Sequence, residues 1–543
     1  MKKAGNKSGK FRGIVVVLLL GILLCPQMVK AGEMDAVTSQ EYVQTIHVSP
    51  GDISKHGFAA AFKRTLRNAK ESGKLLNEKG IVKVEVPAGT YEIDSSMQIN
   101  DSNLTIDFTG CTFIQKSGSN INLLRIGETN DPHTGYYYHD ITIVGGVFDG
   151  SEHSNTLFKA AHAENIRLQG AVLRNVKNGH LIEVAGINGL SVIECSFENQ
   201  ILEKDSKALA YEAIQIDILT HNHLKGYLSE ALATQNVLVE DCVFDHVPRG
   251  VGSHTSIVNC PVNGITIKNT TFRNIGSAAI QGQNWLNVDI SDNQISGCPR
   301  GIALYALGNS GNYIPSDIAF EDGVATDLPD TYIKPDEEQK IKIYKNTIIC
   351  QGKDPYASYD PVGIYVGGLK LTENTKSTNG SVISKGNYYM SGISIKNNTI
   401  QSLGNGMRLE NVRKTIVTDN SMKFVGKKSS KEFHGIQLRL ESQCTDIKNN
   451  KITGYNANGI YLNTKSYTQT ISGNKILKVN KYGIGIENAK AGKIVKNTIS
   501  SAKRYGVNVI EHAVVSSISG NKIGKCGEKI HVSKNSKAKS VKN

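Results

Sequence analysis

Short apolar strands with one polar or small residue between two core positions recur along most of the chain. Examples are Asn-Gly-Ile-Tyr-Leu at 458–462 and Tyr-Gly-Ile-Gly-Ile at 482–486. In such a strand, Ile and Leu face the core and the residue between them faces outward. We interpret the Gly before the first core residue as a bend. Near the C-terminus the pattern repeats about every two dozen residues, a period typical of solenoids.

An Asn stands at one fixed turn position in each repeat, two residues before Ile or Met. We expect Asn there because it tolerates positive φ better than other residues that carry a Cβ. In stacked coils these amides would also lie above one another, and each would donate to the next. The same position falls upstream on Thr270, Cys242 and Cys195. The Asn residues of this set are Asn293, Asn346, Asn398, Asn420, Asn450, Asn474, Asn497 and Asn521.

Two bends and one core strand in constant order predict an all-β chain, a right-handed parallel β-helix. A leucine-rich repeat is disfavoured because the Leu-x-x-Leu-x-Leu run is missing. We expect one continuous solenoid over 101–533, since no linker rich in Pro, Ser or charge interrupts the pattern. Solenoids grow by adding coils, so chain length does not imply several domains.

The N-terminal segment predicts export. Five basic residues precede an apolar run over 14–24, and Val29 and Ala31 are small residues at the cleavage-determining positions. Residues 1–31 are therefore interpreted as a signal peptide cleaved near Ala31, which leaves no transmembrane segment. The mature protein is expected to be secreted or associated with the cell surface.

The net charge and the cysteine spacing argue against several classes of protein. Removal of the signal peptide takes six basic residues and reduces the formal charge from +13 to +7. Much of the remainder lies near the C-terminus, where 534–543 is expected as a basic tail that is solvated or contacts cell-wall polymers. Nothing favours nucleic-acid binding. The cysteines lack Cys-x-x-Cys spacing, which leaves zinc and redox motifs unsupported, and parallel Cβ directions favour buried free thiols at Cys195 and Cys242 over a bridge between them.

Residues 32–100 are expected to form an N-terminal cap. The stretch 57–80 has helical periodicity, and the strand-like run from Val82 follows it. An amphipathic helix here would cover the open end of the solenoid. The helix, the segment Val-Pro-Ala-Gly-Thr-Tyr (86–91) and Leu-Thr-Ile-Asp-Phe (104–108) together resemble the N-terminal part of the pectate-lyase-like β-helix superfamily. The resemblance covers the architecture of about residues 50–530 and implies a protein that binds or cleaves polysaccharides.

The candidate chemistry lies on the coils of residues 180–305, where the outward positions are unusually polar. Because adjacent coils lie about 4.8 Å apart, these side chains are expected to form one patch the size of a few sugar rings. Long insertions at 199–211, 219–235, 306–340 and 351–391 surround these coils, and long loops commonly build substrate walls. The outward residues are Glu183, Gln215, Asp217, His254, Gln281, Gln283 and Tyr305.

Several roles are open to these residues. Asp217 and His254 on neighbouring coils could form a hydrogen-bonded acid–base pair. Sugar hydrolysis needs a second carboxyl group, which Glu183 or Glu212 would supply. Elimination next to a uronate needs a base and a cation, for which His254, Tyr305 and the two arginines Arg249 and Arg300 are candidates.

Further substrate contacts and a metal are also considered. Trp285 could stack on a sugar face or plug a loop against the coil. The acidic segment 306–340 could bind calcium or be solvated, since it lacks regular ligand spacing. No cofactor is required otherwise.

The resemblance stays at superfamily level. Polygalacturonases carry an Asn-Thr-Asp strand, an Asp-Asp pair and a Gly-His-Gly segment, whereas this chain has Ile-Gln-Ile-Asp217, no Asp-Asp pair and Gly-Ser-His254. We predict a polysaccharide-binding and polysaccharide-cleaving enzyme similar to glycoside hydrolases. The alternatives are a lyase acting on uronic-acid polymers and a non-catalytic surface adhesin or wall-binding protein.

Overall fold

The structure is a computed structural model that describes residues 42–542 with internal gaps. The expected signal peptide lies outside the described residues, as does His254. The gaps are 76–79, 154–155, 203–210, 220–223, 229, 231, 254–260, 307–319, 322–323, 326–337, 355–358, 374, 377–381, 384 and 428–429.

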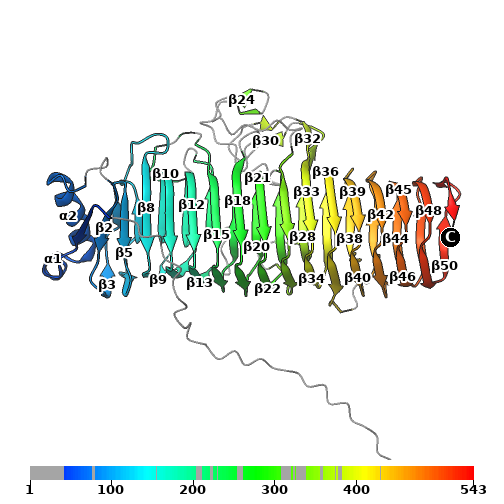
Figure 1. The fold of residues 1–543 in the computed structure, drawn as a ribbon, viewed down its shortest axis with the longest axis horizontal. Helices are drawn as coiled ribbons and strands as arrows, with labels where there is room; N and C mark the ends of the chain where they lie inside the picture. Colours follow the sequence, from blue (N-terminus) through cyan, green and yellow to red (C-terminus); the bar gives the residue numbers. More distant parts are fainter. Residues whose placement is uncertain are drawn as a thin grey trace, which may run out of the picture. The chain divides into compact units, whose positions relative to one another are not determined.

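Two helices, α1 (Pro50–His56) and α2 (Phe58–Glu71), cover one end of the stacked coils (Figure 1). Ser49 caps α1 by accepting a hydrogen bond from the backbone N–H of Asp52. The apolar stripe of α2 is buried, and its Phe58 packs against Phe113 with ring centroids 4.9 Å apart. The helix therefore shields core side chains that the first coil would otherwise expose to water.

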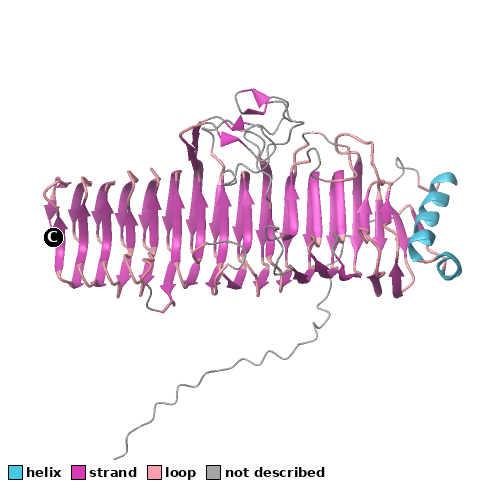
Figure 2. Cartoon of the chain, turned by 180° about the vertical axis from the view of Figure 1, so that it is seen from behind, coloured by secondary structure: helices cyan, strands magenta, loops and turns pink. Residues whose placement is uncertain are grey.

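Each regular coil contributes one strand to each of three parallel faces, which we call faces one, two and three (Figures 1 and 2). Strands β10 and β12 are long enough to run through faces one and two. The strands of face one are β4 (Met97–Ile99), β7 (Leu124–Ile126), β10 (Phe158–Gln169), β12 (Ile182–Ile193), β14 (Glu212–Asp217), β17 (Arg249–Gly252), β20 (Ala278–Gln283), β23 (Arg300–Tyr305), β28 (Val362–Gly367), β35 (Asn405–Glu410), β38 (Ile436–Arg439), β41 (Ile460–Leu462), β44 (Tyr482–Glu487), β47 (Tyr505–Ile510) and β50 (Glu528–Val532).

Face two follows face one in each coil and begins next to the cap. Its strands, besides the second halves of β10 and β12, are β1 (Gln44–His47), β2 (Val82–Glu85), β5 (Leu104–Asp107), β8 (Tyr138–Val144), β15 (Gln235–Glu240), β18 (Val262–Lys268), β21 (Trp285–Ser291), β26 (Ile341–Tyr344), β33 (Met390–Lys396), β36 (Val412–Thr418), β39 (Gln443–Lys448), β42 (Tyr467–Ser472), β45 (Lys490–Val495), β48 (Val514–Ser519), β51 (Lys537–Ala538) and β52 (Val541–Lys542). Residues 537–542, expected as part of a basic tail, thus pair with β48.

Face three closes each coil. Its strands are β3 (Gly89–Ile93), β6 (Cys111–Gln115), β9 (Val147–His153), β11 (Val172–Lys177), β13 (Ser196–Ile201), β16 (Val243–Asp245), β19 (Thr271–Arg273), β22 (Gln294–Cys298), β27 (Thr347–Cys350), β34 (Thr399–Ser402), β37 (Ser421–Phe424), β40 (Lys451–Thr453), β43 (Lys475–Leu477), β46 (Thr498–Ser501) and β49 (Lys522–Lys525). Short antiparallel pairs in the insertions complete the described strands: β24 (Phe320–Glu321) with β25 (Val324–Ala325), β29 (Leu369–Leu371) with β32 (Gly386–Tyr388), and β30 (Thr375–Lys376) with β31 (Val382–Ile383).

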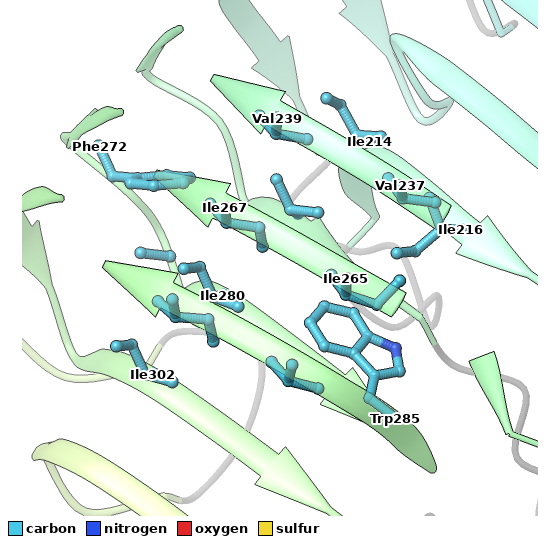
Figure 3. Packing of buried hydrophobic residues seen from close by; sticks show 14 of the residues in the cluster. Ile214, Ile216, Val237, Val239, Ile265, Ile267, Phe272, Ile280, Trp285 and Ile302 are labelled. Carbon is cyan, nitrogen blue, oxygen red and sulfur yellow. The ribbon is translucent and has the colours of Figure 1, made fainter. Parts of the chain in front are cut away.

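The core is filled by the alternate residues that the pattern predicts. Figure 3 shows Ile214, Ile265 and Ile280 packed between the faces. Equivalent aromatic residues stack directly, because Phe244 lies 4.6 Å from Phe197 and 4.7 Å from Phe272 between ring centroids. Burying each such side chain contributes about 1.5–3 kcal/mol.

The Asn residues form the expected ladder between faces two and three. The Asn474 side-chain amide donates to Asn497 Oδ1 and to the Ile447 carbonyl, both at 2.9 Å. Asn474 Oδ1 in turn accepts from the backbone N–H of Asn450 at 2.9 Å. The positive φ, however, belongs to the residue before each Asn, such as Asn449 (φ 55°). Asn is thus required for its buried amide, and the expectation of a positive φ at that residue was wrong.

The Gly before each core Ile is needed for close packing. At Gly459 a Cβ would lie 2.6 Å from the Gly483 carbonyl oxygen and 2.6 Å from a methyl group of Ile476. These glycines therefore let neighbouring coils approach rather than supply a positive φ. The described cysteines form no disulfide, and Cys195 and Cys242 are buried free thiols.

Removal of one ladder amide should destabilise the fold strongly. Asn474→Ala leaves the buried N–H of Asn450 without its acceptor and the Ile447 carbonyl without its donor. At about 1–3 kcal/mol for each of these two unsatisfied groups, we expect a loss of about 2–6 kcal/mol in the free energy of unfolding. Chemical denaturation measures it. The exposed neighbour Lys475 offers the control Lys475→Ala, and equal small effects of both variants would contradict the structural role of the ladder.

Candidate functional site

One column of outward side chains runs along the middle of face one, with one residue from each coil. The residues on either side of each column position are core residues, so the register fixes these side chains about 4.8 Å apart on the outer surface. The column contains Gln98, Arg125, Lys159, Glu183, Gln215, Gly252, Gln281, Ala303, Tyr365, Arg408, Gln437, Tyr461, Gly485, Asn508 and His531.

Glu183 is the candidate carboxyl group that keeps contact with solvent. It lies beside Lys159 in the register of β10 and β12, and its Oε2 is 3.2 Å from Lys159 Nζ. Thr156 Oγ1 donates to the same oxygen at 3.1 Å. Both charged side chains are 12% exposed, so the pair is sheltered but within reach of water. Lys159 was not among the residues predicted from the sequence, although the repeat places it at the outward position of its coil.

Glu212 forms a buried ion pair with Arg249. Arg249 Nη1 donates to Glu212 Oε1 at 2.9 Å, and the carboxylate is fully enclosed. Gly252 makes room for this pair, because a Cβ there would lie 2.9 Å from Glu212 Cγ. A buried pair of this kind is destabilising when one partner is removed. The geometry therefore favours a structural role in which Glu212 and Arg249 hold each other in place.

Asp217 ends β14 and is held on both its side chain and its backbone. Gln215 Nε2 donates to Asp217 Oδ2 at 2.7 Å, and the Thr234 hydroxyl donates to the Asp217 carbonyl. The side chain is fully buried. The expected hydrogen bond from Asp217 to His254 concerns a residue outside the described part of the chain.

Arg300 organises the next two coils. Its guanidinium donates to Tyr305 Oη at 2.8 Å and to both Gln281 Oε1 and Ser277 Oγ at 2.9 Å. Asp354, from the insertion after β27, lies 3.3 Å from Arg300 Nη2 and accepts from Ser277 Oγ at 2.5 Å. We call these five residues the Arg300 cluster. Sequence reasoning missed Ser277 and Asp354, the latter because an insertion carries it outside the repeat.

Trp285 does not lie on the outer surface, so the expectation that it stacks on a sugar face was wrong. Its ring is 1% exposed and packs among core side chains such as Ile265 (Figure 3). Its indole N–H donates to Ser253 Oγ at 2.9 Å. Trp285 is the first residue of β21, where the alternation directs it inward. Gln283 remains half-buried at the end of β20.

An apolar cluster covers the outer surface beside Asp217. Leu219, Leu224, Tyr227 and Leu232 pack on the outward alanines Ala161 and Ala185. The described part of the insertion 219–235 therefore lies on face one and narrows access to the carboxyl groups. In the sequence, the small side chains at these two outward positions indicated that another segment packs against face one there.

The described residues contain no cluster of His, Cys, Asp and Glu side chains suited to a metal ion. Most of the acidic segment 306–340 lies outside them, so calcium binding there stays a prediction. Among the described helices, none is both long and apolar enough to cross a membrane.

The register brings two carboxyl groups onto neighbouring coils. Glu183 pairs with Gln215, and Asp217 lies two residues further along β14. From the rung spacing and the rise along a strand, the Cα atoms of Glu183 and Asp217 are about 8 Å apart. Two side chains that project outward from Cα atoms at this spacing can place their carboxyl groups about 5–10 Å apart, the range in which such groups flank and cleave a glycosidic bond with or without a covalent intermediate.

Residues 380–543 match the family model described as "Right handed beta helix region". The chain is a right-handed parallel β-helix. This agrees with the parallel register over all described coils, and the pectate-lyase-like superfamily suggested by the sequence is consistent with it. No curated protein matches the sequence.

Three solved structures resemble this chain with TM-scores below 0.5. PfbA, a surface adhesin of Streptococcus pneumoniae, is 16% identical, with a TM-score of 0.45 over 82% of this chain and 88% of PfbA. The tailspike protein of E. coli bacteriophage HK620 in complex with a pentasaccharide is 12% identical, with a TM-score of 0.43 over 88% of this chain and 74% of the tailspike. The catalytic domain of a GH87 alpha-1,3-glucanase in complex with tetrasaccharides is 12% identical, with a TM-score of 0.34 over 93% of this chain and 68% of that domain.

A buried histidine on face one makes stability depend on pH. Burial, followed by the positive charges of Lys481, Arg408 and Arg439, lowers the pKa of His434 from 6.5 to about 3. The folded protein therefore keeps this ring neutral while the unfolded chain takes up a proton below pH 6.5. The contribution to stability is complete above pH 6.5 and is lost as the pH falls toward 3.

Urea denaturation at pH 7 and about pH 4.5 tests this effect. At ~1.4 kcal/mol per pH unit, the His434 contribution predicts a loss of roughly 2–3 kcal/mol over this interval. His434→Gln should lower stability at pH 7, because its ring stacks on Tyr461 at 4.6 Å, but should reduce the further loss on acidification. His47→Gln, at a side chain 69% exposed, is the control. An unchanged pH dependence in His434→Gln would contradict the assignment.

Proposed function

We propose that this protein binds an extended polysaccharide along face one and hydrolyses it at Glu183 and Asp217. The observation that carries the proposal is the placement of these carboxyl groups on neighbouring rungs of a straight outward face, with basic and amide partners around them. An extended chain of sugar rings matches a surface that repeats every few ångströms. An extracellular location fits this substrate and the expected signal peptide.

Hydrolysis assigns different roles to the two groups. Glu183 lies 3.2 Å from the Lys159 ammonium and retains solvent contact. It acts as the base that removes a proton from water as the water oxygen bonds to the anomeric carbon. Asp217 donates a proton to the glycosidic oxygen as the bond from that oxygen to the anomeric carbon breaks. The net reaction consumes one water and creates one reducing end.

The remaining polar residues of this region support binding. Gln283, half-buried at the end of β20, offers its amide to sugar hydroxyls, whereas Gln281 and Tyr305 are buried and bonded to Arg300. Arg249 and Arg300 are buried and paired. They hold Glu212 and the Arg300 cluster in place rather than clamp a uronate directly, which favours hydrolysis over elimination.

A non-catalytic binding protein is the second candidate. It is favoured by the complete enclosure of Asp217 and Glu212, each of which already has a partner within the chain. Carboxyl groups used in this way stabilise a binding surface without touching a sugar. The two candidates differ in a single measurable product, the reducing end.

Reducing-end release from a panel of neutral and acidic polysaccharides tests the proposal. Glu183→Gln and Asp217→Asn should each reduce release by about 10²–10⁴-fold while binding persists, because each removes one proton transfer. Glu487→Gln is the matched control, since Glu487 accepts from Tyr461 Oη at 2.7 Å on a distant coil of the same face.

Other products or no product would contradict hydrolysis. Unsaturated products, detected by their ultraviolet absorbance, would indicate a lyase. Binding without product formation would support the non-catalytic candidate. Equal activity losses in Glu487→Gln and Glu183→Gln would place the chemistry elsewhere.

A further inference from the structure

A cavity of about 640 Å³ lies between the cap and face one. Helix α2 lines one side, and the segment around Gln98, the turn at Asn122 and residues 225–226 line the others. Its volume is typical of small-ligand sites. None of the roles proposed for Glu183 and Asp217 uses it.

The charge of the cavity is strongly positive. Lys63, Arg125, Lys159 and Lys225 line it, whereas Asp94 is the one acidic lining residue among those described. These lining residues carry a net charge of +3, which the Glu183 carboxylate paired with Lys159 reduces to +2. A concave surface with one sign of charge concentrates the field and attracts ligands of opposite sign.

The inner cations are held in position by the fold. Arg125 is 5% exposed; its Nε donates to the Glu128 carbonyl at 2.9 Å and its Nη2 to the Gly226 carbonyl at 2.5 Å. The guanidinium also lies 3.8 Å from the ring centroid of Tyr227. Lys159 is fixed by Glu183. A planar guanidinium that is already oriented binds an anionic oxygen with little loss of side-chain entropy.

Among the described residues, no acidic side chain pairs with the outer cations. Lys63 on α2 and Lys225 are exposed, and within the described residues neither forms an ion pair or a hydrogen bond. Gln98 Nε2 donates to Thr129 Oγ1 at 2.8 Å on the same wall. The cavity thus combines a fixed guanidinium, two rim ammonium groups that pair with none of the described acidic residues, and neutral polar groups.

The cavity is continuous with the proposed cleavage site. Gln98, Arg125, Lys159 and Glu183 are consecutive members of the outward column. Two rungs separate Arg125 from Glu183, about 10 Å. A saccharide that reaches Glu183 along this column therefore continues into the basic cavity.

We infer that this cavity is a binding site for an acidic sugar residue, one bearing a carboxylate or a sulfate group. The inference rests on the proposed function for the saccharide nature of the ligand, while the charge preference follows from the cavity alone. The site anchors the substrate next to the cleavage site, and the acidic group pairs with Arg125 and the rim lysines.

Calorimetric binding of three oligosaccharides of equal length to the full chain tests the inference. Tetragalacturonate carries carboxylates, a chondroitin sulfate tetrasaccharide also carries sulfates, and cellotetraose is neutral. We expect at least one acidic ligand to bind about tenfold more tightly than cellotetraose at low salt, with the difference shrinking at high salt. The acidic ligand that binds more tightly identifies the preferred anionic group.

Matched lysine variants locate the site. The double variant Lys63→Gln and Lys225→Gln should lose most of the preference for the acidic ligand. The double variant Lys451→Gln and Lys475→Gln removes the same charge from exposed positions on face three and should keep that preference. Thermal unfolding of both variants should match the unchanged protein, because all four side chains are exposed.

Three results would overturn the inference. Equal affinity for neutral and acidic ligands would remove the charge preference, and if Glu183-dependent cleavage persisted, the proposed function would stand without this site. Equal losses in both double variants would reduce the effect to general charge attraction. Absence of any saccharide binding would overturn the proposed function as well.

Discussion

The fold depends on each coil repeating the hydrogen-bond register of the coil before it. Parallel pairing places every residue beside its equivalent, so a residue that suits one coil must suit its neighbours. Phe197, Phe244 and Phe272 stack for this reason, and so do the Asn amides. A polar side chain placed at an inward position would be buried against its neighbours without a partner, which costs more than most single contacts contribute.

The same register makes face one a functional surface. It aligns charged residues that are far apart in the sequence, such as Arg125, Lys159 and Glu183, into one column. Insertions then enclose part of this column, and enclosure strengthens each electrostatic contact while raising the cost of an unpaired charge. The pairs Glu212 with Arg249 and Arg300 with Asp354 satisfy this requirement. Polar side chains are thus held rigidly beside the more open Glu183.

Periodicity explains which features could be predicted from the sequence. The parallel β-helix, the core positions and the outward order Glu183, Gln215, Gln281 followed from the repeat, because alternation and register are local properties. Insertions follow no period, so the pairing of Arg300 with Asp354 and the apolar cover over Ala185 were not predictable. The inward direction of Trp285 was missed because it begins a new strand after the bend that follows Gln283. The positive φ was misassigned by one residue, since the position before the Asn also holds Asn or Asp in several coils, such as Asp419 and Asn449.

A crystal structure of the Asp217→Asn protein with a bound oligosaccharide tests the central claim most directly, namely that the outward column of face one is the polysaccharide-binding surface. The account predicts sugar density that follows the column past Glu183, with a glycosidic oxygen within hydrogen-bond distance of the residue 217 side chain. Density confined to face two or face three, or a saccharide that crosses face one without approaching Glu183, would contradict it.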